Sequence, residues 1–587
     1  MSRELVDEVI ETEVLVVGGG IAGPRAAIEA HKLGARVFMI VKGVYGSSGC
    51  SLSPSVASGI GPWSDSNDSV EQHLRDMVIL GKQWLSDQEL TKIQAEEGGE
   101  RLLELEGWGM LWDRDEHDKI MLYPNSKLFP GTAIADRWIT FDRRGTHAVG
   151  PFWVGHGTVD VLREQVSRQG IPFIQETIVS HLFVVDNKIA GALAYDYLNS
   201  RIILVKCSAV VVGSGDAAQV YFPHTMVSGE STGDGFALAY DAGAQLLNME
   251  QFEYIAPMHA YPDSARAKAA LESPSESGVM AYLRNSLGER FMERYSPKKE
   301  LASQEEVGWA MWKEVKEGRG GPHGGVFLDF GHVPHEVFQR SCPGRLEFIE
   351  KLGYNLQKEM VEVFPVVHTT TGGIRIGAKC QTKVSGLFAA GQVAFAINDN
   401  LGEGATGFTD ALVWGKRAGE FAAIYSRANK PPEPSKTEVA EEAHRVKAPL
   451  EAISGIPPIK VMRRLQRAMW EGASIVKNEQ GLQKTLREID EIRRTMLDQI
   501  CTSTKSGIFN YEVREAIELR HMLTTSEMIV RASMMRKESR NRFHRSDYPR
   551  RDDDNWLKHI LIEKARTGMS LSTIPVEFPY VKMELKK

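Results

Sequence analysis

Three glycine-rich segments, far apart in the chain, carry the residues best suited to chemistry. EVLVVGGGIAG lies at residues 13–23, AVVVGSGDAA at 209–218 and GLFAAGQVA at 386–394. Each is predicted to be a short β-branched strand that ends in glycines, which lack a Cβ and let backbone N–H groups approach a phosphate or an aromatic ring. One such segment is weak evidence. Three in this order predict a chain that returns twice to one nucleotide.

The first segment begins a predicted βαβ unit. An apolar strand at 14–17 precedes a helix at 22–33, which Gly34 ends, and a second strand follows at 36–41. Strand, turn, helix and strand therefore all agree with a nucleotide-binding unit.

The turn of this unit carries a dinucleotide fingerprint. Gly18 allows the tight turn, Gly20 lets the backbone meet the pyrophosphate, and Gly23 lets helix and strand pack closely. The acidic residue that usually holds the ribose is missing from the end of the second strand, where Val41 and Lys42 stand. This departure weakens a simple NAD interpretation.

Two downstream helices favour FAD. GESTGDGFALAYDAGA (229–244) places Thr232, Asp234 and two glycines at the start of a predicted helix, and NLGEGATGFTDALVWG (400–415) repeats this arrangement after the third strand. The positive end of a helix dipole stabilises a nearby anion. A reduced flavin carries its negative charge around N1 and O2, so a helix that enters at 404–407 would stabilise it.

Composition limits the possible classes of protein. A chain of 587 residues predicts two to four domains, and a formal net charge of −7 gives no indication of nucleic-acid binding. No run approaches the ~18 apolar residues that cross a bilayer, and the acidic N-terminus is unlike a secretory signal. We therefore expect a cytoplasmic protein without direct membrane insertion, associated with a membrane only through a partner.

The five cysteines form no C-x-x-C pair. We expect no metal site on this chain, and any iron–sulfur cluster of the system must lie on another chain.

The chain resembles the flavoprotein subunits of succinate dehydrogenase and fumarate reductase, a superfamily that includes L-aspartate oxidase and the flavin subunit of adenylylsulfate reductase. The resemblance covers about residues 12–580. Besides the glycine-rich segments, its landmarks are GERFMERYSP (288–297), HTTTGG (368–373) and RKESRNRFHRSDYPRRDDDNWLKH (536–559).

The resemblance implies an α/β fold with a Rossmann-like FAD-binding domain of the glutathione-reductase type, interrupted by an α+β capping domain and followed by a three-helix domain and a tail. The expected bounds are 1–244 and 361–430 for the two parts of the FAD-binding domain, 245–360 for the capping domain, 431–535 for the helical domain and 536–587 for the tail. We expect the charged tail to be a solvated or partner-facing surface.

Several dicarboxylate-binding residues of the family are replaced. Gln304 stands at the position of the proton-transferring arginine, and Gly402 at that of a carboxylate-binding arginine. Asn398 and Ile255 stand at the positions of two histidines, so only His368 remains of the carboxylate-binding set. Loss of one buried partner of a charged hydrogen bond typically costs ~2–5 kcal/mol. Succinate and fumarate are therefore not the expected substrates.

Three residues are candidates for catalysis. His368 stands where the family aims a ligand group at the substrate, although it could instead hold the loop between cap and flavin. Glu403 could accept a proton or support a helix N-terminus. Arg290 could contact the substrate, although arginines in this segment more often fix the cap through ion pairs.

The residues expected to contact FAD are Gly18, Gly20, Ile21, Ala22, Gly23, Lys42, Ser48, Gly49, Gly59, Gly213, Ser214, Gly215, Thr232, Asp234, Gly391, Gln392, Gly407 and Phe408. Membrane succinate dehydrogenases link FAD covalently to a histidine. The matching stretch, GSSGCSLSPSVASGIG (46–61), contains no histidine. We therefore expect non-covalent FAD.

The leading hypothesis is a flavoprotein subunit that exchanges a hydride between a small-molecule substrate and FAD. Because a flavin takes up two electrons together and releases them singly, an iron–sulfur protein subunit would exchange electrons with it inside a hetero-oligomer. Two alternatives stay open: flavin chemistry on a sulfur compound, like that of adenylylsulfate reductase, and an FAD electron-relay subunit without a substrate of its own.

Overall fold

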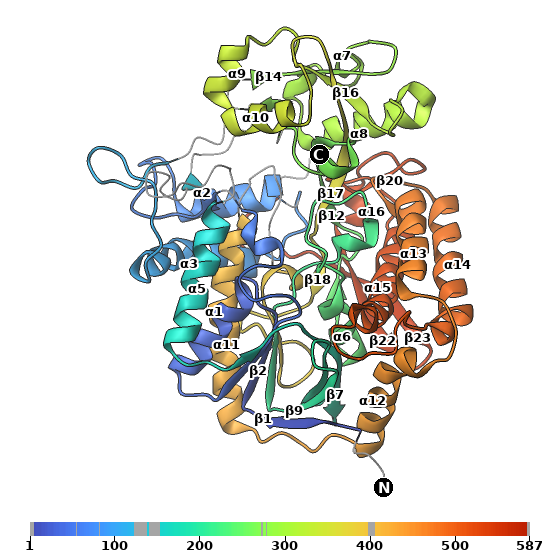
Figure 1. Cartoon of the computed structure of the whole chain (residues 1–587). Coiled ribbons are helices and arrows are strands. Elements are labelled where there is room, and N and C mark those ends of the chain that lie inside the picture. The colour runs from blue at the N-terminus through green and yellow to red at the C-terminus, as the bar shows by residue number, and fades with distance from the viewer. Residues whose placement is uncertain are drawn as a thin grey trace.

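The computed structural model describes residues 5–583 except 55, 82, 123–137, 140–152, 272–273, 277–278 and 397–405. Figure 1 shows the capping domain at the top, the central sheet and its helices below it, and the helical domain at one side. No helix within the described ranges is both long enough and apolar enough to cross a membrane.

A parallel sheet with the strand order β19-β10-β2-β3-β6 forms the centre of the molecule. Its strands are β19 (Leu387–Ala389), β10 (Ala209–Val212), β2 (Val14–Val17), β3 (Val37–Ile40) and β6 (Phe173–Ile174). Val17 and Ala389 both lie opposite Val212. The three predicted glycine-rich segments therefore end at one edge of one sheet.

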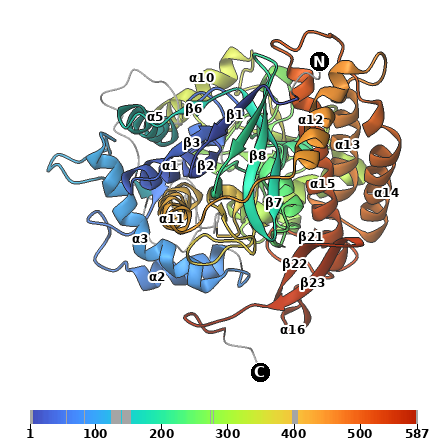
Figure 2. The same cartoon turned by 90° about the horizontal axis from the view of Figure 1, so that it is seen from below.

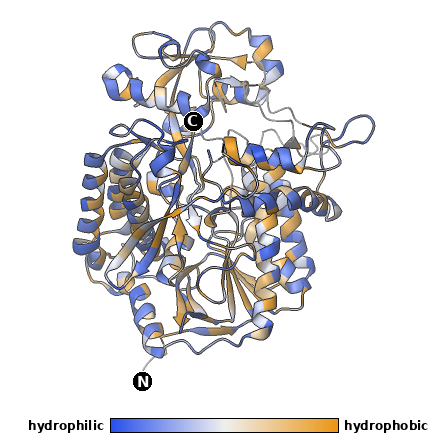
Figure 3. Cartoon of the chain, turned by 180° about the vertical axis from the view of Figure 1, so that it is seen from behind, coloured by the Kyte–Doolittle hydropathy of each residue, from blue (hydrophilic) through white to orange (hydrophobic). Residues whose placement is uncertain are grey.

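Helices cover this sheet on one side. They are α1 (Ala22–Lys32), α2 (Val70–Asp76), α3 (Gln88–Gly107), α5 (Trp153–Arg168) and α11 (Thr406–Ala428). α11 packs against α1 and α3. Figure 3 shows hydrophobic residues gathered in the central strands and hydrophilic residues on the outer helices. The β-branched runs form strands because both of their faces are buried.

A second sheet joins the centre to the helical domain. Its order is β1-β9-β8-β7, with β1 (Glu8–Glu11), β9 (Arg201–Lys206), β8 (Lys188–Asp196) and β7 (Thr177–Val185). Figure 2 shows it between the parallel sheet and the C-terminal helices. Short two-stranded ladders pair β4 (Ala57–Ser58) with β5 (Trp138–Ile139), β13 (Ser275–Glu276) with β14 (Val279–Met280), and β20 (Val476–Lys477) with β21 (His544–Arg545).

The capping domain is an antiparallel sheet with its own hydrophobic core. The strand order is β12 (Phe252–His259), β17 (Val361–Thr370), β16 (Val326–Asp329) and β15 (Tyr282–Arg284). Its helices are α7 (Met292–Tyr295), α8 (Gln304–Glu314), α9 (His335–Ser341) and α10 (Pro343–Lys351). β17 pairs with β12 and β16, and Val361 and Val363 belong to the core of the cap. The cap sheet thus extends past residue 360, where a boundary was expected.

Four long helices follow α11 in the part of the chain that the structure describes. Their bounds are α12 (Lys436–Glu451), α13 (Pro458–Ala473), α14 (Glu479–Thr495) and α15 (Tyr511–Met535). α13, α14 and α15 pack against one another and form the expected three-helix unit, whereas α12 lies against α15, β7 and β8. The α/β fold with cap, helices and tail is confirmed.

The tail is built into the molecule. β22 (Lys558–Ala565) pairs with β23 (Gly568–Pro575) and with β11 (Leu246–Leu247), which also pairs with β18 (Gly373–Ile374). α16 (Asp553–Trp556) precedes this hairpin.

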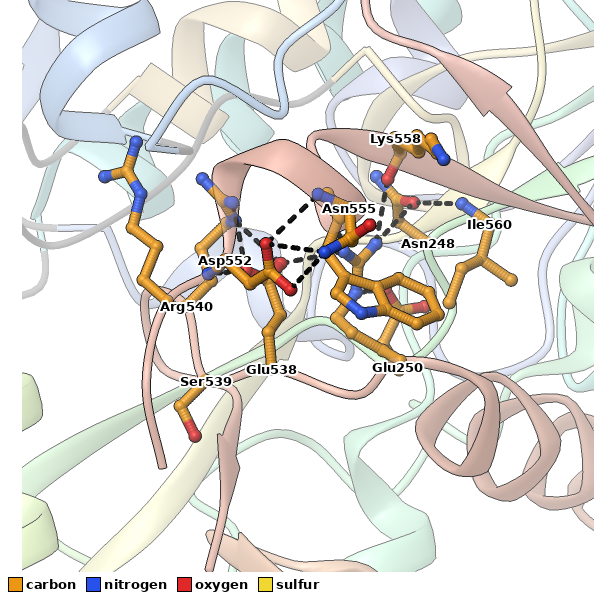
Figure 4. A network of polar contacts seen from close by, with 12 residues as sticks. Asn248, Glu250, Glu538, Ser539, Arg540, Asp552, Asn555, Lys558 and Ile560 are labelled. Carbon is orange, nitrogen blue, oxygen red and sulfur yellow. Dashed lines mark hydrogen bonds and ion pairs between the residues drawn. The ribbon is translucent and has the colours of Figure 1, made fainter. Parts of the chain in front are cut away.

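The expectation of a solvated tail is wrong for most of its arginines. Arg536, Arg540, Arg542 and Arg545 are buried. Arg536 Nε lies 2.7 Å from Glu250 Oε1, which precedes β12, and both Arg536 and Arg540 contact Glu538 Oε1, at 3.1 and 2.8 Å. Figure 4 shows Glu538 and Arg540 of the tail in one polar network with Asn248 and Glu250, which precede β12. The dense run of charged residues predicted an exposed tail, but charged side chains can be buried when they are paired.

We predict that Glu538→Gln loosens the tail. Because the substitution leaves two buried guanidinium groups without their shared carboxylate, it should lower stability by roughly 3–5 kcal/mol. The measurements are the urea midpoint and protease cleavage within residues 536–560. The control, Glu471→Gln, removes an exposed carboxylate 3.7 Å from Lys484 and should change little. Equal behaviour of the two variants would refute the structural role of the network.

Candidate functional site

A cavity of about 710 Å³ opens at the carboxyl ends of the parallel strands. The turns after β2, β10 and β19 line it with residues 17–22, 213–216 and 391–392. In open parallel sheets, ligands bind outside the carboxyl ends of the strands. From there the cavity continues beneath the cap as far as α10.

The turn after β2 depends on contacts that only glycine allows. Gly18 has a φ of 123°, and a Cβ there would lie 2.2 Å from the carbonyl oxygen of Gly213. A Cβ on Gly23 would lie 2.0 Å from the carbonyl oxygen of Gly18, so Gly23 serves helix packing as expected. The N-cap residue of α1, Ile21, makes no side-chain cap, and its own N–H donates to Ser51 Oγ at 3.1 Å. The N–H groups of Ala22 and Gly23 at this helix end suit the pyrophosphate of a dinucleotide.

Lys42 lies two residues after the end of β3, and acidic side chains of the protein pair with it. Its Nζ lies 2.5 Å from Asp234 Oδ2, 2.6 Å from Thr232 Oγ1 and 2.8 Å from Glu518 Oε1. Burial alone would raise the pKa of Asp234, but the charge of Lys42 and the hydrogen bond with His521 outweigh burial and lower it. Asp234, the first residue of α6 (Asp234–Asp241), is thus an ionised partner of Lys42.

All but three of the residues expected to contact FAD line the cavity. The exceptions are Gly23, Thr232, which contacts Lys42, and Gly59, where a Cβ would lie 3.3 Å from the backbone nitrogen of Gly99 on α3. Gly407 and Phe408, in the first turn of α11, are among the lining residues. Glu403 lies outside the described residues.

β17 brings His368 to the cavity, where a buried ion pair holds it. His368 Nδ1 lies 2.7 Å from Oε2 of Glu253 on β12, and Glu253 also pairs with Arg542 of the tail. Glu253 is 1% exposed and Arg542 3% exposed. A carboxylate beside Nδ1 favours the tautomer that carries its proton there, which leaves the other ring nitrogen to exchange protons.

Glu253 was not among the expected residues. The signal that could have found it is its place directly after Gln251 and Phe252, in the segment where the resemblance puts a histidine. Ile255, the residue assigned to that histidine, lines the cavity two residues further along β12.

Asp216 also lines the cavity and was not expected there. Burial raises the pKa of Asp216, although hydrogen bonds with Ser231 and Thr369 and the charge of His368 oppose this. Burial, supported by the charge of Asp216, raises the pKa of the Cys50 thiol to about 12. Cys50 lines the cavity, and its raised pKa disfavours the thiolate form.

Two other expected positions serve the packing of the cap. The Gln304 side chain accepts a hydrogen bond from the backbone nitrogen of Ala256, at 3.1 Å. Arg290, a catalytic candidate, does not line the cavity: its Nη2 lies 2.6 Å from Glu300 and its guanidinium 3.7 Å from the ring of Tyr282. The alternative role of Arg290, fixing the cap, is the one that the structure favours.

We predict that Gly20→Val yields protein without bound flavin. Its Cβ would meet only the Ser51 hydroxyl at 2.8 Å, so the fold should persist while the branched side chain occupies the path of the pyrophosphate. A loss of ~1.4 kcal/mol or more weakens binding at least tenfold. The ratio of absorbance at the flavin band to protein absorbance measures this, with circular dichroism as the check on folding. Gly107→Val, where no atom lies within 4 Å, is the control. Equal flavin content in both variants would overturn the assignment.

The comparisons with known proteins agree with this geometry. Residues 13–407 match the model of the FAD binding domain family, and residues 462–587 match that of the fumarate reductase flavoprotein C-terminus. One of the subunits of fumarate reductase (CoM/CoB) from Methanothermobacter marburgensis is 32% identical over 95% of this chain and 98% of that protein.

Solved structures agree as well. Mycobacterium smegmatis Sdh1 in complex with UQ1 is 29% identical, with a TM-score of 0.87 over 98% of this chain and 96% of that one. Adenylylsulfate reductase of Archaeoglobus fulgidus shares the fold at 18% identity, with a TM-score of 0.76 over 98% of this chain and 97% of that one. The chain therefore belongs to the family of FAD-dependent oxidoreductase flavoprotein subunits of succinate dehydrogenase and fumarate reductase.

Proposed function

We propose that this chain oxidises or reduces a small organic substrate other than succinate or fumarate, and that it exchanges electrons with an iron–sulfur partner subunit. The observation that carries this proposal is the cavity itself. His368 lines it and is backed by the buried Glu253 and Arg542. Gln304 is bonded to the backbone of β12, and Ile255 lines the cavity with a hydrocarbon side chain.

Bound FAD supplies the redox chemistry, because it exchanges two electrons as a hydride and passes them on singly. The glycine-lined strand ends and the N-terminus of α1 would hold its pyrophosphate. Cys50 is kept as a thiol by burial, so the link to FAD is non-covalent in this proposal.

His368 moves the proton that accompanies the hydride. In oxidation the substrate loses a hydride from one carbon and a proton from its neighbour, and the imidazole takes the proton; in reduction it returns the proton. Glu253 stabilises the charged imidazolium, and Arg542 compensates the buried carboxylate. Asp216, whose pKa is raised by burial, lines the same cavity.

The space beneath the cap favours an enzyme over a pure electron relay, because the cavity extends past the glycine turns to α10. The partner is inferred from chemistry. The part of the chain that the structure describes holds no cluster of three or more His, Cys, Asp or Glu side chains that could bind a metal. The proposal therefore places the centres that accept single electrons on a partner chain.

The test is reoxidation of chemically reduced, FAD-loaded protein under anaerobic conditions, without any partner. Reoxidation by an unsaturated organic acid other than fumarate supports the proposal, whereas reoxidation by fumarate would refute the exclusion of that substrate. Reoxidation by adenylylsulfate, which takes up the two electrons and leaves as sulfite and AMP, would support the sulfur-compound alternative instead. Reoxidation only by a protein partner would refute an enzyme and support the relay.

We predict that Glu253→Gln slows this reoxidation about 10²-fold and shifts the midpoint of its pH profile to lower pH. The imidazolium of His368 loses its neighbouring negative charge, so the protonated form persists only at lower pH. Glu253→Asp should restore part of the rate. The control is Glu362→Gln, because Glu362 makes a similar pair with His323, at 2.6 Å, and neither residue lines the cavity. A profile that Glu253→Gln leaves unchanged would contradict the proton-transfer role.

A further inference from the structure

The cavity has a second part that the mechanism above does not use. Beyond His368 it continues into the cap, and we call this part the cap-side lobe. Its wall is formed by Met226, Ile255, Met258, Ala267, Ala269 and Phe348.

The lobe is built on the cap sheet and the chain that returns beside it. Ile255 and Met258 lie on β12, and Ala269 bridges to Met258 from the returning chain. Ala267 donates a backbone hydrogen bond to the His259 carbonyl at 2.9 Å. Phe348 comes from α10.

Hydrophobic core backs the wall of the lobe. Ile255, Met258 and Ala267 are buried in one cluster with Phe364 and Val366, and Met226 and Ala269 pack against it. A carboxylate placed against such a wall would lose its hydration without gaining a partner, which is costly. A hydrocarbon would bind favourably there, because its apolar surface would be removed from water. Methionine side chains adapt readily to its shape.

Positive charge lies beside this wall. Lys268 and Arg345 line the same end of the cavity, and Lys268 Nζ lies 5.6 Å from the ring centroid of Phe348. Burial, together with the charges of Arg345 and Lys268, lowers the pKa of nearby His259 to about 4. The positive charge of this end therefore belongs to the lysine and the arginine at neutral pH.

We infer that the substrate is an organic acid with one negative charge and an apolar body that packs in the cap-side lobe. This inference rests on the proposed function and names its substrate class. The anionic group fits the end that Lys268 and Arg345 line, and the body fits the hydrocarbon wall. The reaction adds or removes two hydrogens across a carbon–carbon bond: the hydride is exchanged with FAD and the proton with His368.

The first test is a series of straight-chain 2-enoates, from crotonate to 2-octenoate, together with fumarate. Binding to the FAD-loaded protein is followed by the change in flavin absorption. Each buried methylene should tighten binding about fourfold. Fumarate, with a second carboxylate in place of the hydrocarbon, should bind weakest. A series without a trend, tighter binding of fumarate, or no response to any enoate overturns the inference.

The second test changes the lobe. Phe348→Ala should reduce the gain in binding affinity for each added methylene. Lys268→Met should weaken the binding of 2-octenoate about tenfold and leave the binding of its uncharged amide unchanged. Lys268 is exposed, so the latter variant should fold. Lys351→Met removes a lysine at the end of α10, which also carries Phe348, but this lysine is paired with Glu347; it is the control and should bind like the parent. Equal losses in Lys268→Met and Lys351→Met overturn the placement of the anionic group.

The two proposals fail differently. If the enoates show no trend but another small molecule reoxidises the reduced flavin, with dependence on His368, the substrate class is wrong and the proposed function stands. If no small molecule reoxidises the reduced flavin, the proposed function is wrong, and the substrate class that rests on it is wrong as well.

Discussion

The close backbone contact between the turns that follow β2 and β10 is the constraint on which the site depends. Gly18 and Gly213 leave no room for a side chain between them. This contact brings segments nearly two hundred residues apart to one point, and the parallel pairing of β19 with β10 adds the third segment. The cavity exists because all three strands stop at the same edge. A site assembled in this way can hold a long dinucleotide with backbone groups and needs few charged side chains.

Three distant segments also meet beside the nucleotide site and position the histidine there. His368 comes from β17, Glu253 from β12 and Arg542 from the tail, and they meet through one buried carboxylate. The buried arginines of the tail also tie it to Glu250, just before β12. The C-terminal tail thus helps to orient His368, because its Arg542 pairs with Glu253. Such buried ion pairs contribute little net stability but fix an arrangement strongly, because breaking one leaves an unpaired charge.

Much of this architecture could be predicted from local patterns. β-branched runs followed by glycines predicted the strands and turns, and the spacing of their glycines predicted the role of Gly23. Partners distant in sequence could not be predicted in the same way. Nothing near Lys42 indicates that Asp234 and Glu518 neutralise it, and nothing near His368 indicates Glu253. The tail was misjudged for the same reason, since a dense run of charges looks solvated until the carboxylates that pair with it are known.

The expected replacement of the dicarboxylate-binding residues and the apolar lobe support the same proposed substrate. Gln304 and Ile255 are described by the structure, and Ile255 belongs to the hydrocarbon that lines the cavity. Asn398 and Gly402 lie outside the described residues. The nucleotide site, by contrast, keeps its glycines. The most direct measurement of this central claim is the flavin content of purified protein after acid precipitation. The account predicts about one FAD per chain, released into the supernatant. A colourless protein that cannot be reconstituted, or flavin that stays with the precipitated chain, would contradict it.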